Sequence, residues 1–182
     1  MTKLNIGCGD NLITGFVNID PFQEAEVDLR HNFITDGPYP FEAGSVNEIV
    51  MFHTIEHIEK KYHEGLLNEF YRLLKPKGLL IISYPEFERC AQNWIKNHQA
   101  MRTFWEATIY GRQLNKGDFH VSLMDSINFK ALLTFCGFPD SYITSEPKQL
   151  HNSVAFCKKG VKPIKYENLI ARDMQELLIE QA

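Results

Sequence analysis

Short strand-like segments alternate with helix-like segments along this chain, and that alternation limits the possible folds more than any other feature. Val46–Phe52 is predicted to be a strand, and Leu79–Tyr84 is apolar almost throughout, as expected of a strand buried on both faces of a parallel sheet. Between them, Lys60–Leu74 carries leucines and a phenylalanine at helical spacing. Strands that alternate with helices indicate a parallel sheet. Further strands are predicted at Lys3–Ile6, Phe16–Ile19, Glu26–Arg30, Ser141–Ser145 and Ser153–Lys158.

The predicted fold class is α/β: a Rossmann-like, doubly wound, mostly parallel seven-stranded sheet with helices on both faces. The 182 residues suit one domain. We expect residues 1–160 to form it, with a helical segment at 86–125 covering the substrate and residues 161–182 adding an amphipathic helix packed on the same domain. The connection at 10–15 is too short for a crossover helix, so the first helix should be reduced to a turn.

Composition narrows the class of partner. The net charge of −4 gives no reason to expect a nucleic acid. No apolar run approaches the roughly 20 residues of a membrane span, and the N-terminus lacks the apolar stretch of a signal peptide. The four cysteines are scattered, which favours a reducing compartment. We therefore expect a cytoplasmic protein, with the apolar side of 166–181 packed on the sheet or used in a homodimer.

Polar motifs fall where the predicted strands end. Gly7-Cys8-Gly9 follows the first strand, and its glycines allow the backbone to approach a ligand closely. Asp20 ends the second strand, where a carboxylate can accept both hydroxyl hydrogens of a ribose. The dinucleotide fingerprint fits poorly, because Leu12 stands where its third glycine is needed and Asp20 is only 11 residues beyond Gly9. A nucleoside ligand without a pyrophosphate fits better.

With these motifs, the chain resembles the class I S-adenosylmethionine-dependent methyltransferases, in particular the short group related to the methyltransferase type 11 domain. The first two family motifs are matched by Gly7-Cys8-Gly9 and by the Gly-Phe-Val-Asn-Ile-Asp sequence at 15–20. Further segments follow in the family's order. They lie at 27–33, 38–42, 45–49, 53–58, 72–78, 110–113, 117–120 and 132–138. The resemblance covers about residues 3–158.

The resemblance implies that S-adenosylmethionine is the cofactor. The glycine loop would line its methionine half, and Asp20 would hold the ribose. Asn32 and Phe33 would meet the adenine, while Phe52 and His53 would flank the sulfonium. The implied cofactor-binding residues are Asn5, Gly7, Cys8, Gly9, Asp20, Asn32, Phe33, Phe52 and His53.

The methyl acceptor needs residues of its own. Related short family members act on small molecules, so the resemblance implies a small-molecule substrate with a hydroxyl or amine group. Such a nucleophile benefits from a base, and histidine suits this because its unperturbed pKa lies near 6.5. His57 and His120 are the candidate catalytic residues. Glu56 could orient a neighbour or bind substrate, whereas Tyr84 and Glu86 are more simply explained by packing at the sheet edge.

Two alternatives remain open. Asn5 and Asn32 stand where family members often have acidic residues, so the chain could bind the cofactor without catalysis. Residues 53–57 also satisfy the H-x-x-E-H signature of a zinc hydrolase, in which both histidines share one helix face. The preceding strand runs directly into His53, and a strand-to-helix corner would misplace it relative to His57. We therefore expect no metal site.

Overall fold

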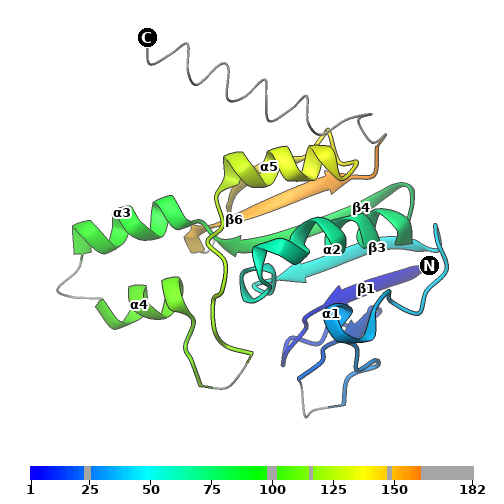
Figure 1. Ribbon diagram of the computed structural model, residues 1–182, viewed down its shortest axis with the longest axis horizontal. Coiled ribbons are helices and arrows are strands. Elements are labelled where there is room, and N and C mark those ends of the chain that lie inside the picture. Colours follow the sequence, from blue (N-terminus) through cyan, green and yellow to red (C-terminus); the bar gives the residue numbers. More distant parts are fainter. Residues whose placement is uncertain (23–25, 98–101, 115–116, 147–148, 161–182) are drawn as a thin grey trace, which may run out of the picture.

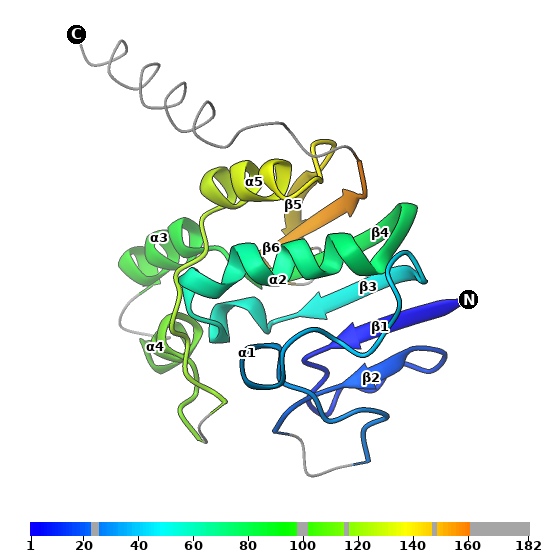
Figure 2. The same ribbon diagram turned by 45° about the vertical axis from the view of Figure 1, so that its right-hand side comes forward.

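The computed structural model describes residues 1–22, 26–97, 102–114, 117–146 and 149–160. Six strands form one sheet in the order β2-β1-β3-β4-β6-β5 (Figures 1 and 2). The strands are β1 (Thr2–Ile6), β2 (Val17–Ile19), β3 (Val46–Phe52), β4 (Leu74–Pro85), β5 (Tyr142–Glu146) and β6 (Gln149–Lys158). The helices are α1 (Phe33–Asp36), α2 (Lys60–Leu73), α3 (Phe87–Asn97), α4 (Arg102–Tyr110), α5 (Ser126–Phe135) and the short 3₁₀ helix η1 (Ile55–His57).

The sheet is mixed, with a parallel part followed by an antiparallel edge. β1 pairs in parallel with β2 on one side and with β3 on the other, and β3 pairs in parallel with β4. β6 is antiparallel to both β4 and β5. This confirms the predicted Rossmann-like α/β class. The strand order reverses between β1 and β3, so the carboxyl ends of these two strands form the switch point at which such sheets bind ligands.

The structure has six strands in its described residues, whereas the sequence predicted seven. The segment predicted as the third strand, 26–30, forms only an isolated parallel bridge between Leu29 and Ile19 at the edge of the sheet. A side chain competes with the ladder here, because Asp28 accepts a hydrogen bond of 2.7 Å from the backbone N–H of Asn18. The segment therefore follows the edge of β2 without pairing along its length.

No helix lies between β1 and β2, as the short connection predicted, and buried amide side chains support the loop instead. Asn5 Nδ2 donates to the carbonyl oxygen of Asn11 (2.8 Å) and to Asn18 Oδ1 (2.9 Å). The same Asn18 oxygen accepts the backbone N–H of Ile13 (2.9 Å). These bonds satisfy backbone groups of the loop that a helix would have satisfied internally.

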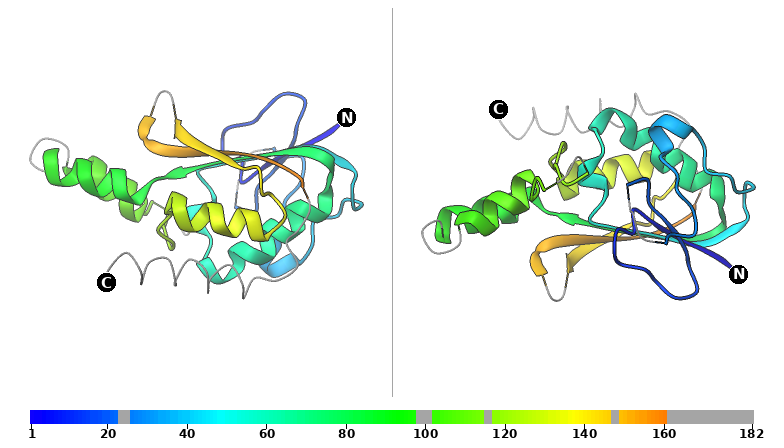
Figure 3. Two further views of the ribbon diagram at one scale, coloured as in Figure 1. Left: turned by 90° about the horizontal axis from the view of Figure 1, so that it is seen from above. Right: turned by 90° about the horizontal axis from the view of Figure 1, so that it is seen from below.

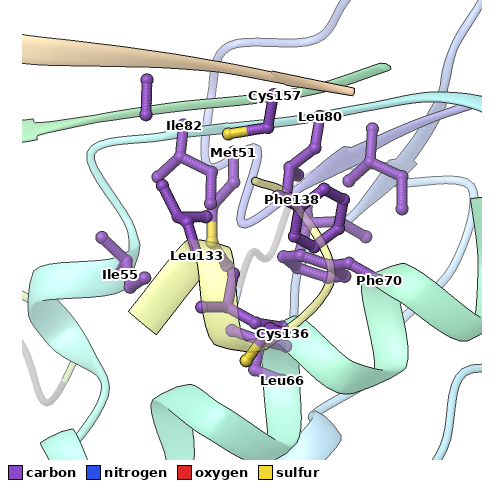
Figure 4. Close-up of a cluster of buried hydrophobic side chains, with 14 of the residues drawn as sticks. Met51, Ile55, Leu66, Phe70, Leu80, Ile82, Leu133, Cys136, Phe138 and Cys157 are labelled. Atoms are coloured by element: carbon purple, nitrogen blue, oxygen red, sulfur yellow. The ribbon is translucent and has the colours of Figure 1, made fainter. Parts of the chain in front are cut away.

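Helices α2 and α5 lie on one face of the sheet (Figures 1 and 3). Every third or fourth residue of α2 is apolar, and this stripe packs on the strands with side chains from α5 (Figure 4). Asp125 caps α5, because Oδ1 accepts the N–H groups of Ile127 (2.8 Å) and Asn128 (3.0 Å). Fully buried members of the core are Leu66, Leu67, Phe70, Leu80, Ile82 and Leu133.

In the described part of the chain, no helix lies over the opposite face of the sheet, although helices were predicted on both (Figure 3). Leu79 of β4 and Phe156 of β6 point to that face and are 38% and 45% exposed. The predicted C-terminal helix at 166–181 falls outside the described residues. Helices α3 and α4 extend beyond the carboxyl end of β4 (Figure 1). No described helix has the length and apolar character required to cross a membrane.

Candidate functional site

The Gly7-Cys8-Gly9 loop turns at the carboxyl end of β1 and has one closed side and one open side. Gly7 has φ of +66°, and a Cβ there would lie 2.2 Å from Thr54 Cγ2. Gly9 has φ of +49°, yet nothing lies within 4 Å of its Cβ position. Burial, with Asp20 nearby, raises the pKa of the Cys8 thiol to about 11, so the thiol stays neutral. The open backbone at Gly9 fits a ligand that approaches closely.

Asp20, predicted to hold a ribose, supports the glycine loop. Its Oδ2 accepts the backbone N–H of Gly9 (3.0 Å), and its Oδ1 accepts the N–H of Phe22 (2.8 Å). A carboxylate offers about four acceptor sites, so this bonding does not exclude a ribose contact. Asp20 thus connects the end of β2 to the glycine loop through a hydrogen bond.

The predicted adenine-binding pair lies beside the carboxyl end of β1, at the short helix α1 (Figures 1 and 2). Asn32 caps this helix, because its Oδ1 accepts the N–H of Ile34 (2.9 Å). The Phe33 ring stacks against Tyr39, with ring centroids 6.1 Å apart. The other implied amide, Asn5, is 2% exposed and is bonded within the loop between β1 and β2.

The end of β3 meets the glycine loop across the switch point. Thr54 Oγ1 lies 3.1 Å from the carbonyl oxygen of Gly7 and 3.0 Å from that of Phe52, and it can donate its proton to either. The backbone at His53 turns sharply, with φ of +50°, and its N–H donates to the carbonyl oxygen of Ser83 (3.0 Å). The end of β3, with Phe52 and His53, therefore lies beside the glycine loop, and the contact of these two residues with a sulfonium stays a prediction.

A cavity of about 290 Å³ opens beside His53. It brings together the two histidines predicted to act on substrate, whose ring centroids are 4.7 Å apart in a T-shaped arrangement. Side chains from η1, α4, the segment at 118–120 and the start of β6 line it. They include His53, Glu56, His57, Arg112, His120 and Asn152.

Backbone bonds to η1 hold His120 in the cavity. The N–H groups of Val121 and Ser122 both donate to the carbonyl oxygen of Glu56 (2.9 and 3.1 Å). His57 Nδ1 lies 3.0 Å from the carbonyl oxygen of Phe119. A carbonyl only accepts, so Nδ1 carries the proton and Nε2 of neutral His57 keeps a lone pair. Burial lowers the pKa of His120, which favours its neutral form.

Glu56 is the most unusual group in the cavity. It is 2% exposed, and neither carboxylate oxygen has a hydrogen-bond partner. His53 Nδ1 lies 3.6 Å from Glu56 Oε1, and His53 Nε2 lies 3.5 Å from Glu146 Oε2. Burial opposes a charge on His53, but the two carboxylates outweigh it and raise the pKa of His53. A buried carboxylate without bonded partners is costly, which indicates a site that receives a ligand.

Tyr84 and Glu86 serve the packing at the end of β4, in agreement with the simpler interpretation. Glu86 accepts the N–H of Ser126 (3.2 Å) and the hydroxyls of Ser126 and Ser153 (2.9 Å for Ser153). Tyr84 is fully buried, and its hydroxyl lies 3.1 Å from Ser126 Oγ. Both side chains therefore join α5 to the sheet.

The zinc-hydrolase alternative needs His53 and His57 on one face of a helix. His53 instead ends the strand, and η1 is a 3₁₀ helix of three residues. The two imidazoles have different partners, Glu146 and Phe119. Among the described residues, the group able to hold a metal ion is Glu56, His57 and His120, without His53.

Several residues in or next to the cavity had no signal in the sequence. Asn152 of β6 lines the cavity, and its Nδ2 donates to Oε2 of Glu146 on β5 (2.9 Å), a carboxylate that contacts His53. Arg112 pairs with Asp118 at 2.9 Å, and both line the cavity. Arg112 and Asp118 lie in the region of the chain that carries the family resemblance, but the resemblance gave neither residue a role.

This chain is similar to known proteins in both sequence and fold. A family model described as a methyltransferase domain matches residues 4–138. No curated protein sequence matches the chain. The fold is similar to that of a SAM-dependent methyltransferase from Archaeoglobus fulgidus, with a TM-score of 0.60 at 14% identity over 87% of this chain and 86% of that chain.

Two further solved structures have the same fold. For a SAM-dependent methyltransferase from Thermotoga maritima the TM-score is 0.59 at 16% identity, covering 87% of this chain and 81% of that chain. For a SAM-dependent methyltransferase from Methanosarcina mazei it is 0.57 at 16% identity, covering 89% of this chain and 93% of that chain.

Proposed function

Because the chain belongs to the methyltransferase-domain family and is an S-adenosylmethionine-dependent methyltransferase, we propose that it methylates a hydroxyl or amine group of a small molecule. The acceptor lies in the cavity that contains His57 and His120. The observation that carries this proposal is the hydroxyl of Thr54, 3.1 Å from the carbonyl oxygen of Gly7. It joins the loop that faces the cofactor to the segment that lines the cavity.

S-adenosylmethionine supplies a methyl group activated by a sulfonium leaving group. The residues of the chain mainly position the two reactants and limit their contact with water. Gly9 presents an open backbone to the cofactor, and Asp20 holds that loop in place from the end of β2. In our proposal Asp20 also accepts hydroxyl hydrogens of the ribose.

The two histidines supply the proton acceptor. The lone pair of His57 lies on Nε2, because Nδ1 is directed at the carbonyl oxygen of Phe119. His120 is kept in its neutral form, because burial lowers its pKa. A neutral imidazole at either position can take the proton that an oxygen or ammonium nitrogen must lose. Glu56 lies beside both and can orient the acceptor.

The experiment is a calorimetric titration of the protein with S-adenosylmethionine and with S-adenosylhomocysteine, repeated on Asp20→Ala. Micromolar binding corresponds to about −8 kcal/mol. Loss of a charge-assisted ribose contact should cost roughly 1.5–3 kcal/mol of it. Asp140→Ala is the control, because Asp140 is an exposed carboxylate beyond α5 and should leave the affinity unchanged.

Three outcomes separate the alternatives. Binding of both ligands, weakened in Asp20→Ala and followed by methyl transfer to a hydroxyl or amine in a substrate screen, supports the proposal. Binding without turnover on any such acceptor favours the non-catalytic cofactor-binding domain. Absence of binding by either ligand contradicts the assignment of the glycine loop.

A further inference from the structure

Three side chains in the acceptor cavity form a group with the chemistry of a metal site. One ligand atom each from Glu56, His57 and His120 can be chosen so that all lie within 4.8 Å of one another. We propose that these residues hold a divalent transition-metal cation to which a hydroxyl group of the acceptor binds. The inference rests on the proposed function and deepens it, and it departs from the expectation of no metal site.

The first argument is the state of Glu56. Its carboxylate is 2% exposed and has no hydrogen-bond partner at either oxygen. Buried charges in proteins are paired or coordinate metals, because desolvation of an isolated ion is costly. The nearest basic group, His53 Nδ1, is 3.6 Å away, beyond a hydrogen bond, and His53 also faces Glu146. One shared imidazole leaves the two carboxylates with a net negative charge, which a divalent cation would balance.

The second argument is independent of Glu56 and concerns the two imidazoles. Histidines that ligate metals almost always donate their other ring N–H to a carbonyl, carboxylate or water. His57 does so through Nδ1, at 3.0 Å from the carbonyl oxygen of Phe119. His120 has a hydrogen bond to the backbone of Thr108. In each ring the remaining nitrogen is therefore available for a cation.

The third argument is that backbone hydrogen bonds already hold together the two chain segments that carry the proposed metal-ligating side chains. The carbonyl oxygen of Glu56 accepts from both Val121 and Ser122 (2.9 and 3.1 Å). The N–H of His120 donates to the carbonyl oxygen of Tyr110 (3.1 Å). Gly111 makes this approach possible, because a Cβ there would lie 1.7 Å from the carbonyl oxygen of Asp118. Rigid support of this kind is what a metal site requires.

Two histidines and one carboxylate suit Zn²⁺, Mn²⁺ or Fe²⁺ and leave coordination positions open for a substrate atom. Ligands about 2.1 Å from a tetrahedral ion lie roughly 3.4 Å from one another. The atoms of this group are within 4.8 Å, so small side-chain rotations bring them to that spacing. His53 stays outside the group, between Glu56 and Glu146.

The role of the cation is to acidify the acceptor. A bound divalent ion lowers the pKa of a coordinated hydroxyl, as it does for coordinated water. The proton leaves to water at the cavity mouth. A lone pair of the deprotonated oxygen then forms the bond to the methyl carbon, while the carbon–sulfur bond breaks and its electron pair stays on sulfur. The metal changes no oxidation state, and in this arrangement the imidazoles ligate the ion instead of taking the proton.

The test is calorimetric titration of the chelator-treated full chain with ZnCl₂ and with MnCl₂, without cofactor. We expect one ion per chain, with the affinity lowered on the order of 100-fold in Glu56→Gln and in His120→Gln. His151→Gln is the matched control. His151 lies in the same cavity but packs against Trp105, outside the ligand group, so the metal affinity should not change. Far-ultraviolet circular dichroism of each variant establishes that it is folded.

A spectroscopic measurement keeps the test independent of variant stability. The wild-type protein loaded with Co²⁺ should show the visible absorption bands of a nitrogen- and oxygen-ligated ion, and Zn²⁺ should displace them. Absence of stoichiometric Zn²⁺ and Mn²⁺ binding overturns the inference, as does equal affinity in wild type and Glu56→Gln. S-adenosylmethionine titrated in chelator gives the separate readout: binding there, without a metal site, leaves the proposed function intact and refutes only the cation.

Discussion

The cofactor side and the acceptor side of this protein are built in opposite ways. On the cofactor side, the loop between β1 and β2 satisfies its polar groups locally: Asp20 accepts the N–H of Gly9, and Asn5 bonds to Asn11 and Asn18. On the acceptor side, residues far apart in the sequence meet, and Glu56 is buried with both carboxylate oxygens unbonded.

The polar residues on the cofactor side therefore hold the shape of the site, whereas those on the acceptor side keep groups that a ligand can bind. The cofactor side uses polar side chains to hold the backbone of its loop, and that loop has room beside Gly9. The acceptor side brings a buried carboxylate without hydrogen bonds and two imidazoles together in a cavity of about 290 Å³. We therefore expect substitutions on the cofactor side to affect folding and binding together, and those on the acceptor side to affect ligand chemistry with less effect on stability.

The largest effect is expected at Gly7, where the cofactor side is most tightly packed. Gly7→Ala places a Cβ 2.2 Å from Thr54 Cγ2 in a residue whose φ is +66°. The left-handed conformation costs about 1 kcal/mol for a non-glycine residue, and overpacking adds about 1–3 kcal/mol. Urea unfolding should therefore show a loss of about 2–4 kcal/mol in the free energy of unfolding, with weaker S-adenosylmethionine binding.

Gly9→Ala is the matched variant two residues away. Its φ is +49°, but its Cβ would meet nothing within 4 Å. The expected cost in unfolding free energy is only about 1 kcal/mol from backbone strain, whereas cofactor affinity should fall because the new methyl group occupies the open side of the loop. Equal destabilisation of the two variants would contradict the contrast between the closed and open sides.

The same contrast explains what the sequence could predict. Strands β1 and β3 and helix α2 follow local apolar patterns, and the sequence predicted all three in place. The motif around Gly7 and Asp20 spans few residues, so it could be recognised in the sequence, and its role in binding stays a prediction. The segment at 26–30 was predicted as a strand, but the pairing of Asp28 with Asn18 reduces it to one bridge. Whether the Asp28 side chain faces solvent or bonds to a neighbouring backbone group depends on tertiary contacts. The apolar periodicity of the sequence carries no information about those contacts.

The acceptor cavity was predictable only in part, for the same physical reason. His57 and His120 were named from their positions after the strand at 46–52 and after the aromatic segment, and the structure brings their rings together. Their joining through the carbonyl oxygens of Glu56 and Phe119 is a long-range backbone contact without a sequence signature. Glu146 was missed because it contacts His53 from β5, far away in the sequence.

A smaller effect is expected where the two sides meet, at Thr54. Thr54→Val keeps the branched shape but removes the hydroxyl that can donate to the carbonyl oxygen of Gly7. Loss of one such hydrogen bond costs about 1 kcal/mol in the free energy of unfolding. Thr54→Ser, which keeps the hydroxyl, is the control for hydrogen bonding. Calorimetry should show a several-fold loss of S-adenosylmethionine affinity in the valine variant, and retention of full affinity would mean that the two sides are not coupled through this contact.

The smallest effect is electrostatic and belongs to the acceptor side alone. The carboxylates of Glu56 and Glu146 outweigh burial and raise the pKa of His53 in the folded protein above its usual value of 6.5. Because the pKa of His53 is higher in the folded than in the unfolded protein, its ion pairs contribute fully to the free energy of unfolding at a pH below the unfolded-state pKa. This contribution is lost as the pH rises through the folded-state pKa. Because the His53 side chain is 37% exposed, solvent screening keeps this contribution small.

The measurement is urea unfolding of wild type and His53→Gln at about pH 6, below the usual pKa of histidine, and at about pH 8.5, above it. The wild type should lose more stability than the variant over this interval. His120 and His151, whose pKa values are lowered mainly by burial, are present in both proteins, so most of their contribution cancels in the difference. Glu146→Gln removes one of the two carboxylates and should reduce the difference. An identical pH dependence in wild type and His53→Gln would mean that Glu56 is not neutralised by His53, which would leave the buried carboxylate still more dependent on a cationic ligand.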